Sequence, residues 1–132
     1  MTALPRTPSF RLDGRRALVT GAGRGIGLAA AAALAQAGAE VTLAARSGAE
    51  VEEAAAAIRA EGGRAEAVAL DVTDLAAMRA ALAARPSFDV LVNNAGSARH
   101  AHFLEVTEAD YDAIMASTCA RPSSSCRRWR AA

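Results

Sequence analysis

Glycines crowd one short stretch of the chain, residues 20–27, which reads Thr-Gly-Ala-Gly-Arg-Gly-Ile-Gly. The apolar run just before it, 16–20, predicts a buried strand, and the alanine-rich run 26–37 predicts a helix that ends at Gly38. A glycine-rich turn from a strand into a helix directs several backbone N–H groups at one point, beside the positive end of the helix dipole. Because glycine has no Cβ, an anion can approach closely. The stretch therefore predicts a site for phosphate or pyrophosphate.

The elements that must position this loop follow in regular alternation. Further strands are predicted at 40–45, 65–70 and 88–92, and helices at 49–60 and 74–84, the last capped by Thr73 or Asp74. Such alternation implies right-handed crossovers, a parallel sheet and helices on both of its faces, which is an α/β fold. A further helix is predicted over 111–115, preceded by a capping box that starts at Thr107.

Three motifs occur in order along the chain. The loop has the pattern T-G-x-x-x-G-x-G, Asp-Val-Thr-Asp follows at 71–74, and Asn-Asn-Ala-Gly follows at 93–96. With these motifs the chain resembles the short-chain dehydrogenase/reductase family over residues 10–116, and is similar to its 3-oxoacyl-carrier-protein reductases and sugar-acid dehydrogenases. The resemblance implies a Rossmann-type, doubly wound parallel sheet in strand order 3-2-1-4, truncated after the fourth strand. It does not identify a substrate.

The resemblance also implies a nicotinamide dinucleotide as the cofactor. The loop would contact its pyrophosphate and ribose, and Asp71 would meet the adenine amino group beside the Val72 backbone. Small residues would let the cofactor lie against the fourth strand, where an asparagine ties neighbouring strands. The predicted binding residues are Gly21, Gly23, Arg24, Gly25, Ile26, Gly27, Arg46, Ser47, Asp71, Val72, Asn93, Ala95 and Gly96. An alternative role for Asp71 is to cap a helix, which suits Asp74 better.

The choice between NADP and NAD depends on the end of the second strand. An acidic side chain there would bind the ribose 2′-OH and repel a 2′-phosphate, but Ala45 occupies the place and Arg46 follows it. A guanidinium pairs well with phosphate, and Arg24 in the loop can reach the same side. We therefore expect NADP, with NAD as the less favoured cofactor. The alternative for Arg46 is a solvated arginine at a strand end.

The sequence lacks the catalytic residues that the resemblance implies. Family members use a tyrosine with a lysine four residues beyond it, a serine, and a helix asparagine. The single tyrosine, Tyr111, is followed four residues later by Met115, and all 15 basic residues are arginine. We therefore expect that this chain, although related to oxidoreductases that act on CH–OH groups, has no activity as written. The open edge at 88–92 predicts aggregation, and the helices that pair subunits in the family would be lost.

The last part of the chain breaks the pattern. We expect a flexible leader at 1–11, a partial NAD(P)-binding domain at 12–116 and an irregular basic tail at 117–132, with four arginines and no acidic residue. Reading its codons one base earlier restores an apolar, helix-like sequence, so our hypothesis is a frameshift near residue 116. The alternative is a genuine tail that binds a partner, attached to a non-enzymatic dinucleotide-binding or regulatory module. A separate chain that supplies the missing half is a third reading.

Composition bears on where the protein acts and on whether it binds nucleic acid, membrane or metal. The net charge is +1, and no apolar run is long enough to span a bilayer. The first ten residues lack the apolar region of a secretory signal, and two cysteines, Cys119 and Cys126, fit a reducing compartment. We therefore expect a cytoplasmic protein that binds neither nucleic acid nor membrane. His100 and His102 alternate on a loop without cysteine or carboxylate partners, so we expect no metal site.

Overall fold

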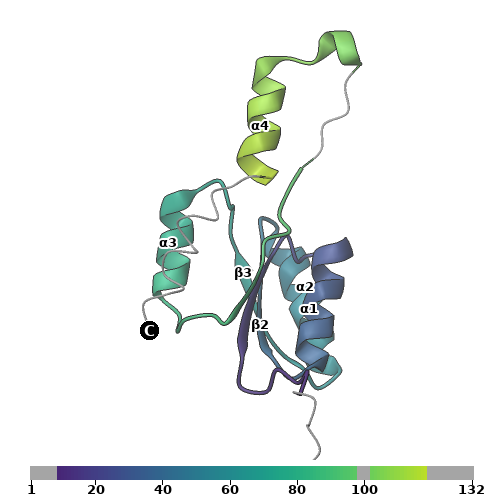
Figure 1. The fold of residues 1–132 in the computed structure, drawn as a ribbon, viewed down its shortest axis with the longest axis vertical. Helices are drawn as coiled ribbons and strands as arrows, with labels where there is room; N and C mark the ends of the chain where they lie inside the picture. Colours follow the sequence, from purple (N-terminus) through teal and green to yellow (C-terminus); the bar gives the residue numbers. More distant parts are fainter. Residues whose placement is uncertain (1–8, 98–101, 119–132) are drawn as a thin grey trace, which may run out of the picture.

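The computed structural model describes residues 9–97 and 102–118. Strands and helices alternate along this part of the chain (Figure 1). In order they are β1 (Arg16–Thr20), α1 (Gly25–Gln36), β2 (Glu40–Ala45), α2 (Gly48–Ala60), β3 (Arg64–Ala69), α3 (Leu75–Ala83), β4 (Val90–Val92), a 3₁₀ turn (Phe103–Glu105) and α4 (Glu108–Thr118).

The four strands form one parallel sheet in the order β3-β2-β1-β4. This order confirms the predicted Rossmann-type arrangement. Helices α1 and α2 cover one face of the sheet and α3 covers the other (Figure 1). The carboxyl ends of all four strands therefore meet at one edge, where the order reverses between β1 and β4, and this is where open α/β sheets bind ligands.

The core lies mainly between the sheet and the pair α1 and α2. Val19, Val41 and Leu43 on the strands are fully buried there, against Ala31 of α1 and Val51 of α2. Each such aliphatic side chain contributes about 1.5–3 kcal/mol by its burial. The face under α3 has a smaller buried cluster, composed of Leu18, Ala44, Leu70 and Met78. The strands that carry the predicted site are thus fixed from both sides.

Of the four α-helices in residues 9–97 and 102–118, three begin with a side-chain cap. Ser47 caps α2 through its Oγ, which accepts from Glu50 N at 3.3 Å. Asp74, rather than Thr73, caps α3 by accepting from Ala77 N at 2.9 Å. At α4, Thr107 and Asp110 form the predicted capping box. Helix α1 differs, because the residue at its N-cap position, Arg24, makes no capping hydrogen bond.

Two predicted strands differ from the structure. β3 begins one residue earlier than expected, because Arg64 already pairs with Glu40 of β2. β4 has only three residues, so the strand predicted at 88–92 is two residues too long, although β4 does lie at the edge of the sheet. The two residues before β4 still contact β1. Arg16 stacks over the Phe88 ring at 5.7 Å, and Asp89 donates its N–H to Arg16 O at 2.8 Å while its carboxylate accepts from Arg16 N at 2.9 Å.

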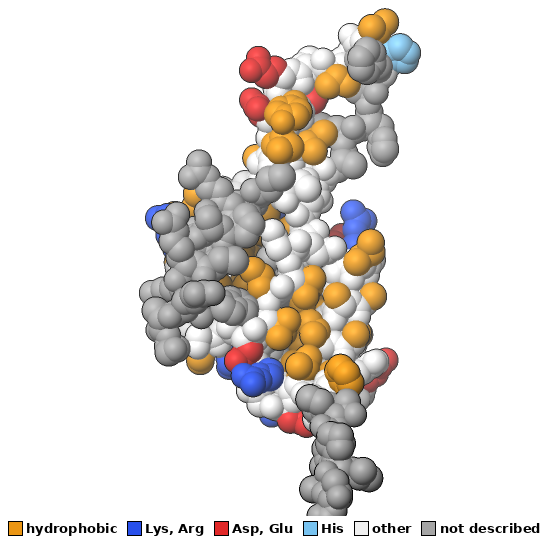
Figure 2. Space-filling model, in the orientation of Figure 1, with side chains coloured by type: hydrophobic (Ala, Val, Ile, Leu, Met, Phe, Trp, Pro, Cys, Tyr) orange, Lys and Arg blue, Asp and Glu red, His pale blue; other side chains and the backbone are white. Residues whose placement is uncertain are grey.

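Helix α4 projects away from the sheet (Figure 1) and has no buried residue. It runs to Thr118, so the first two residues of the predicted irregular tail are helical. Hydrophobic side chains are visible along α4 and over α1 (Figure 2). Residues 119–132, which include both cysteines and the four tail arginines, lie outside the described residues, so the frameshift and the tail boundary stay predictions.

At the other end of the chain, residues 1–8 also lie outside the described part. Arg11, the last residue of the expected leader, is anchored: its guanidinium lies 2.8 Å from Asp13 Oδ1 and donates to Gln36 O at 3.2 Å. Within the described ranges, no helix combines the length and the apolar character that crossing a bilayer requires.

Candidate functional site: a cleft at the carboxyl ends of the strands

A cleft of about 470 Å³ opens at the carboxyl edge of the sheet. It is bounded by the loop after β1, the ends of β2 and β3, the segment after β4 and one side of α4. Its lining comprises Gly21, Gly23, Arg24, Ala45, Arg46, Ser47, Glu50, Leu70, Asp71, Val72, Thr73, Ala95, Gly96, Ser97, Ala113 and Ser117.

The glycine loop takes a conformation that other residues would disturb. Gly21 has a φ of +64°, and a Cβ placed there would lie 2.9 Å from Ala95 Cα. A Cβ on Gly27 would overlap the carbonyl oxygen of Gly21 and lie 2.6 Å from Asn94 Nδ2. The first turn of α1 therefore packs directly against the start of the loop and the segment after β4, which explains why glycine is required at both positions.

Thr20 and Asn94 hold the loop in this shape. The buried Thr20 Oγ1 accepts from the backbone N–H groups of Asn94 at 3.1 Å and Ala95 at 3.0 Å, and lies 3.3 Å from Asn93 Oδ1, to which it can donate. The Asn94 amide donates to Gly21 O at 3.1 Å and to Thr20 O at 3.3 Å. The strand end of β1 is thus tied to the residues that follow β4. Neither Thr20 nor Asn94 was among the predicted binding residues, although both belong to the motifs that the sequence shows.

The N-terminus of α1 is a potential anion site. No side chain caps it and its first turn has no acidic residue, whereas the other three helices are capped by Ser47, Asp74 and Thr107. The first N–H groups of a helix have no partner within the helix, and they carry the positive end of its dipole. Here they follow a glycine loop that lines the cleft. This arrangement can bind a phosphate through backbone donors alone.

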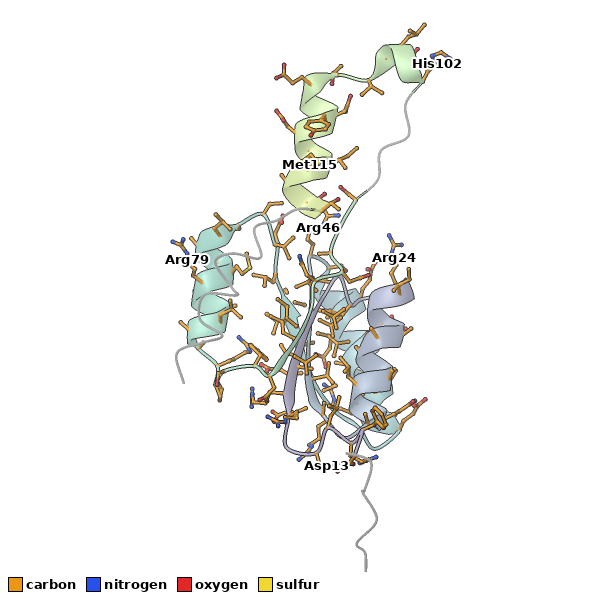
Figure 3. All side chains as sticks on the ribbon, viewed as in Figure 1. Asp13, Arg24, Arg46, Arg79, His102 and Met115 are labelled. Atoms are coloured by element: carbon orange, nitrogen blue, oxygen red, sulfur yellow. The ribbon has the colours of Figure 1, made fainter. Side chains whose placement is uncertain are left out.

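Two arginines add positive charge at the same edge. Arg24 and Arg46 lie at the end of the sheet opposite Asp13 (Figure 3). Neither guanidinium forms an ion pair with a carboxylate of the described residues. Arg46 immediately follows β2, and both arginines line the cleft, so both are available to an anionic ligand.

Asp71 lines the cleft beyond the end of β3. Its Oδ1 accepts from Thr73 N at 2.9 Å and from Thr73 Oγ1 at 2.7 Å. These two hydrogen bonds lower the pKa of Asp71 below its ordinary value, and the charge of Arg46 lowers it further, so the carboxylate is ionised at neutral pH. Asp71 closes a local turn and does not cap α3, which Asp74 does.

Nine of the thirteen predicted binding residues line this one cleft, and four do not. Three of these four, Gly25, Ile26 and Gly27, lie in the first turn of α1. The Ile26 side chain is 82% exposed and points away from the core. The fourth, Asn93, contacts Thr20. Sequence reasoning missed the contribution of α4 through Ala113 and Ser117, because nothing in their residue types marks a site. It also missed Glu50. His102 is exposed and does not line the cleft, and His100 lies outside the described residues.

A model of the short chain dehydrogenase family matches residues 15–120. The chain belongs to this family. Gluconate 5-dehydrogenase of Gluconobacter oxydans is 43% identical over 110 residues, which cover 80% of this chain and 43% of that protein. L-xylulose reductase of Bos taurus is 44% identical over 103 residues, 78% of this chain and 41% of that protein. The chain thus spans less than half the length of these curated relatives.

Solved structures of family members superpose well on the fold. A gluconate 5-dehydrogenase from Burkholderia cenocepacia in complex with NADP and tartrate is 38% identical, with a TM-score of 0.80 over 91% of this chain and 50% of that one. A metagenomic short-chain oxidoreductase in complex with NADP is 40% identical, with a TM-score of 0.72 over 80% of this chain and 50% of that one. The fold therefore matches that of the part of the family that these chains share.

Proposed function

We propose that the cleft binds the adenosine diphosphate part of NADP(H). The observation that carries this proposal is the uncapped N-terminus of α1, which follows a glycine loop at the point where the strand order reverses. The other three α-helices of the described residues are capped by side chains, whereas this end leaves its N–H donors for an anion. The related solved structures with NADP bound support the same assignment.

Each predicted binding residue has a role in this proposal. The loop from Gly21 to Gly27 holds the pyrophosphate through backbone N–H groups. Arg24, Arg46 and Ser47 bind the 2′-phosphate, Asp71 and Val72 contact the adenine, and Asn93, Ala95 and Gly96 border the nicotinamide half. The lining of the cleft fits such a ligand, since it combines two arginines, four hydroxyl side chains and small residues that leave room for it. NADP(H) is favoured over NAD(H) because Ala45 offers no carboxylate at the strand end.

The bound coenzyme would supply hydride chemistry between nicotinamide and a carbonyl or alcohol. The 132 residues contain no lysine, and Met115 stands four residues after Tyr111, so the proton relay that the family resemblance implies is not formed by them. The role proposed for this chain on its own is therefore binding without turnover.

Titration calorimetry of the whole 132-residue chain with NADP⁺ and NAD⁺ tests the proposal. NADP⁺ should bind more tightly. Arg46→Ala should weaken NADP⁺ binding by about tenfold, which corresponds to the loss of one charge-assisted hydrogen bond of roughly 1.4 kcal/mol, and should leave NAD⁺ binding almost unchanged. The matched control is Arg79→Ala, which removes an exposed arginine on α3, away from the cleft (Figure 3). Absence of binding for both coenzymes, or equal effects of the two variants, would contradict it.

A further inference from the structure

Glu50 brings a carboxylate into the cleft beside the proposed phosphate sites. It lies in the first turn of α2, where its backbone N–H donates to Ser47 Oγ at 3.3 Å. A Cβ built on Gly23 would lie 3.3 Å from Glu50 Oε2 and 3.7 Å from the Cβ of Ala45. The carboxylate therefore lies over the glycine loop and next to the end of β2, although it belongs to neither element.

Glu50 is one of four charged side chains that line the cleft, with Arg24, Arg46 and Asp71. Its carboxylate forms no ion pair with any described residue, and Arg24 and Arg46 form none either. The cleft thus presents two guanidinium groups without an ion pair, together with the Glu50 carboxylate and the carboxylate of Asp71, which accepts from Thr73. A carboxylate in such a place accepts hydrogen bonds from ribose hydroxyls and repels a phosphate.

We propose that Glu50 is a specificity residue that supplies, from α2, the carboxylate that Ala45 does not supply at the end of β2. The two arginines favour a phosphorylated ribose, and Glu50 opposes them. The chain therefore accepts both coenzymes with a smaller preference for NADP(H) than the arginines alone would give. This inference rests on the proposed function, since it concerns the same coenzyme at the same cleft.

The test compares NADP⁺ and NAD⁺ binding to the full chain and to Glu50→Gln by titration calorimetry. Removing the negative charge should tighten NADP⁺ binding by about fivefold, the effect expected for charges a few ångströms apart in a solvated site, and should leave NAD⁺ binding unchanged or weaker. The control is Glu53→Gln. It removes the same charge from an exposed position of the same helix outside the cleft, and its ratio of the two affinities should equal that of the parent chain.

A second variant, Glu50→Asp, keeps the charge and the favourable position near the N-terminus of α2 but withdraws the carboxylate by one methylene. Its affinity ratio should lie between those of the parent and Glu50→Gln. If both coenzymes bind but Glu50→Gln leaves their ratio unchanged, or Glu53→Gln changes it equally, the role of Glu50 is refuted and the proposed function stands. If neither coenzyme binds the parent chain, the proposed function fails, and the role of Glu50 fails with it.

Discussion

The loop after β1 and helix α4 border the same cleft, but they are held in very different ways. In the loop, Ala22 is fully buried, and the strand end before it is tied to the segment after β4 by the Thr20 hydroxyl and the Asn94 amide. Helix α4 has no buried residue, and Tyr111 and Met115 are 58% and 39% exposed. A hydrogen bond of 2.7 Å between Ser97 and Ser117 joins α4 to the segment after β4.

The loop after β1 is shaped by tertiary contacts, whereas α4 is shaped by its local sequence. The loop adopts left-handed glycine conformations, and two neighbouring strands fix its ends, so its shape depends on the whole sheet. Helix α4 forms from local signals, the capping box of Thr107 and Asp110 among them, and gains little from packing. The glycine-loop side of the cleft is therefore held by the sheet, whereas the α4 side lacks a packed support.

The largest effect is expected at Gly27. In Gly27→Ala the new methyl group would overlap the Gly21 carbonyl and crowd Asn94, so the loop or α1 must move. Such overpacking against backbone should lower the free energy of unfolding by about 1–3 kcal/mol. Urea unfolding followed by circular dichroism measures it, and coenzyme binding should weaken in parallel, since the same shift displaces the N–H groups of α1.

Gly48→Ala is the matched control for this change. The Cβ would make only an ordinary contact, 3.5 Å from Ala69 Cβ, at the first position of α2. Because alanine favours a helix over glycine, this variant should be unchanged or more stable by up to about 1 kcal/mol. Equal losses in the two variants would show that the loop is no more constrained than an ordinary helix start.

A smaller loss is expected when the Thr20 hydroxyl is removed. Thr20→Val keeps the shape of this buried side chain but leaves the N–H groups of Asn94 and Ala95 without their acceptor. Losing these hydrogen bonds should cost about 1–2 kcal/mol of unfolding free energy, measured by urea unfolding. The corresponding change in α4, Thr118→Val, affects an exposed residue and should stay within about 0.5 kcal/mol. A larger loss for Thr118→Val than for Thr20→Val would reverse the contrast.

Much of the fold could be read from the sequence because local and tertiary signals agree there. The strands at 16–20 and 40–45 are β-branched or apolar runs that end at glycine or arginine, and their boundaries match β1 and β2. β4 was predicted two residues too long because Phe88 and Asp89 lead directly into its apolar run. Both contact Arg16 of β1, Asp89 through its backbone N–H and its carboxylate, but the strand pairing begins only at Val90. The sequence could not decide which residue caps α3, because Thr73 and Asp74 are adjacent and both are favourable N-cap residues; the structure has Asp74.

The site could be predicted only as far as its motifs extend. The glycines, Arg46 and Asp71 follow strand ends, and parallel strands bring their carboxyl ends to one edge, so their meeting follows from topology. Glu50 could not be placed in this way, since a glutamate in the first turn of a helix usually serves the helix dipole. Glu50 lines the cleft because of the way α2 packs beside Gly23, and this packing cannot be inferred from the residue types.

The smallest effect is expected in α4. Tyr111→Ala removes a side chain that is more than half exposed and packs against no buried cluster, so the free energy of unfolding should change by less than about 0.5 kcal/mol. Native-state hydrogen exchange should show the amides of α4 exchanging well before those of α1, because a helix without buried contacts opens locally at little cost. If Tyr111→Ala destabilised the chain as much as Thr20→Val, or if α4 and α1 were equally protected, α4 would be part of the cooperative core. The contrast between a loop fixed by the sheet and a helix fixed by its own sequence would then be wrong.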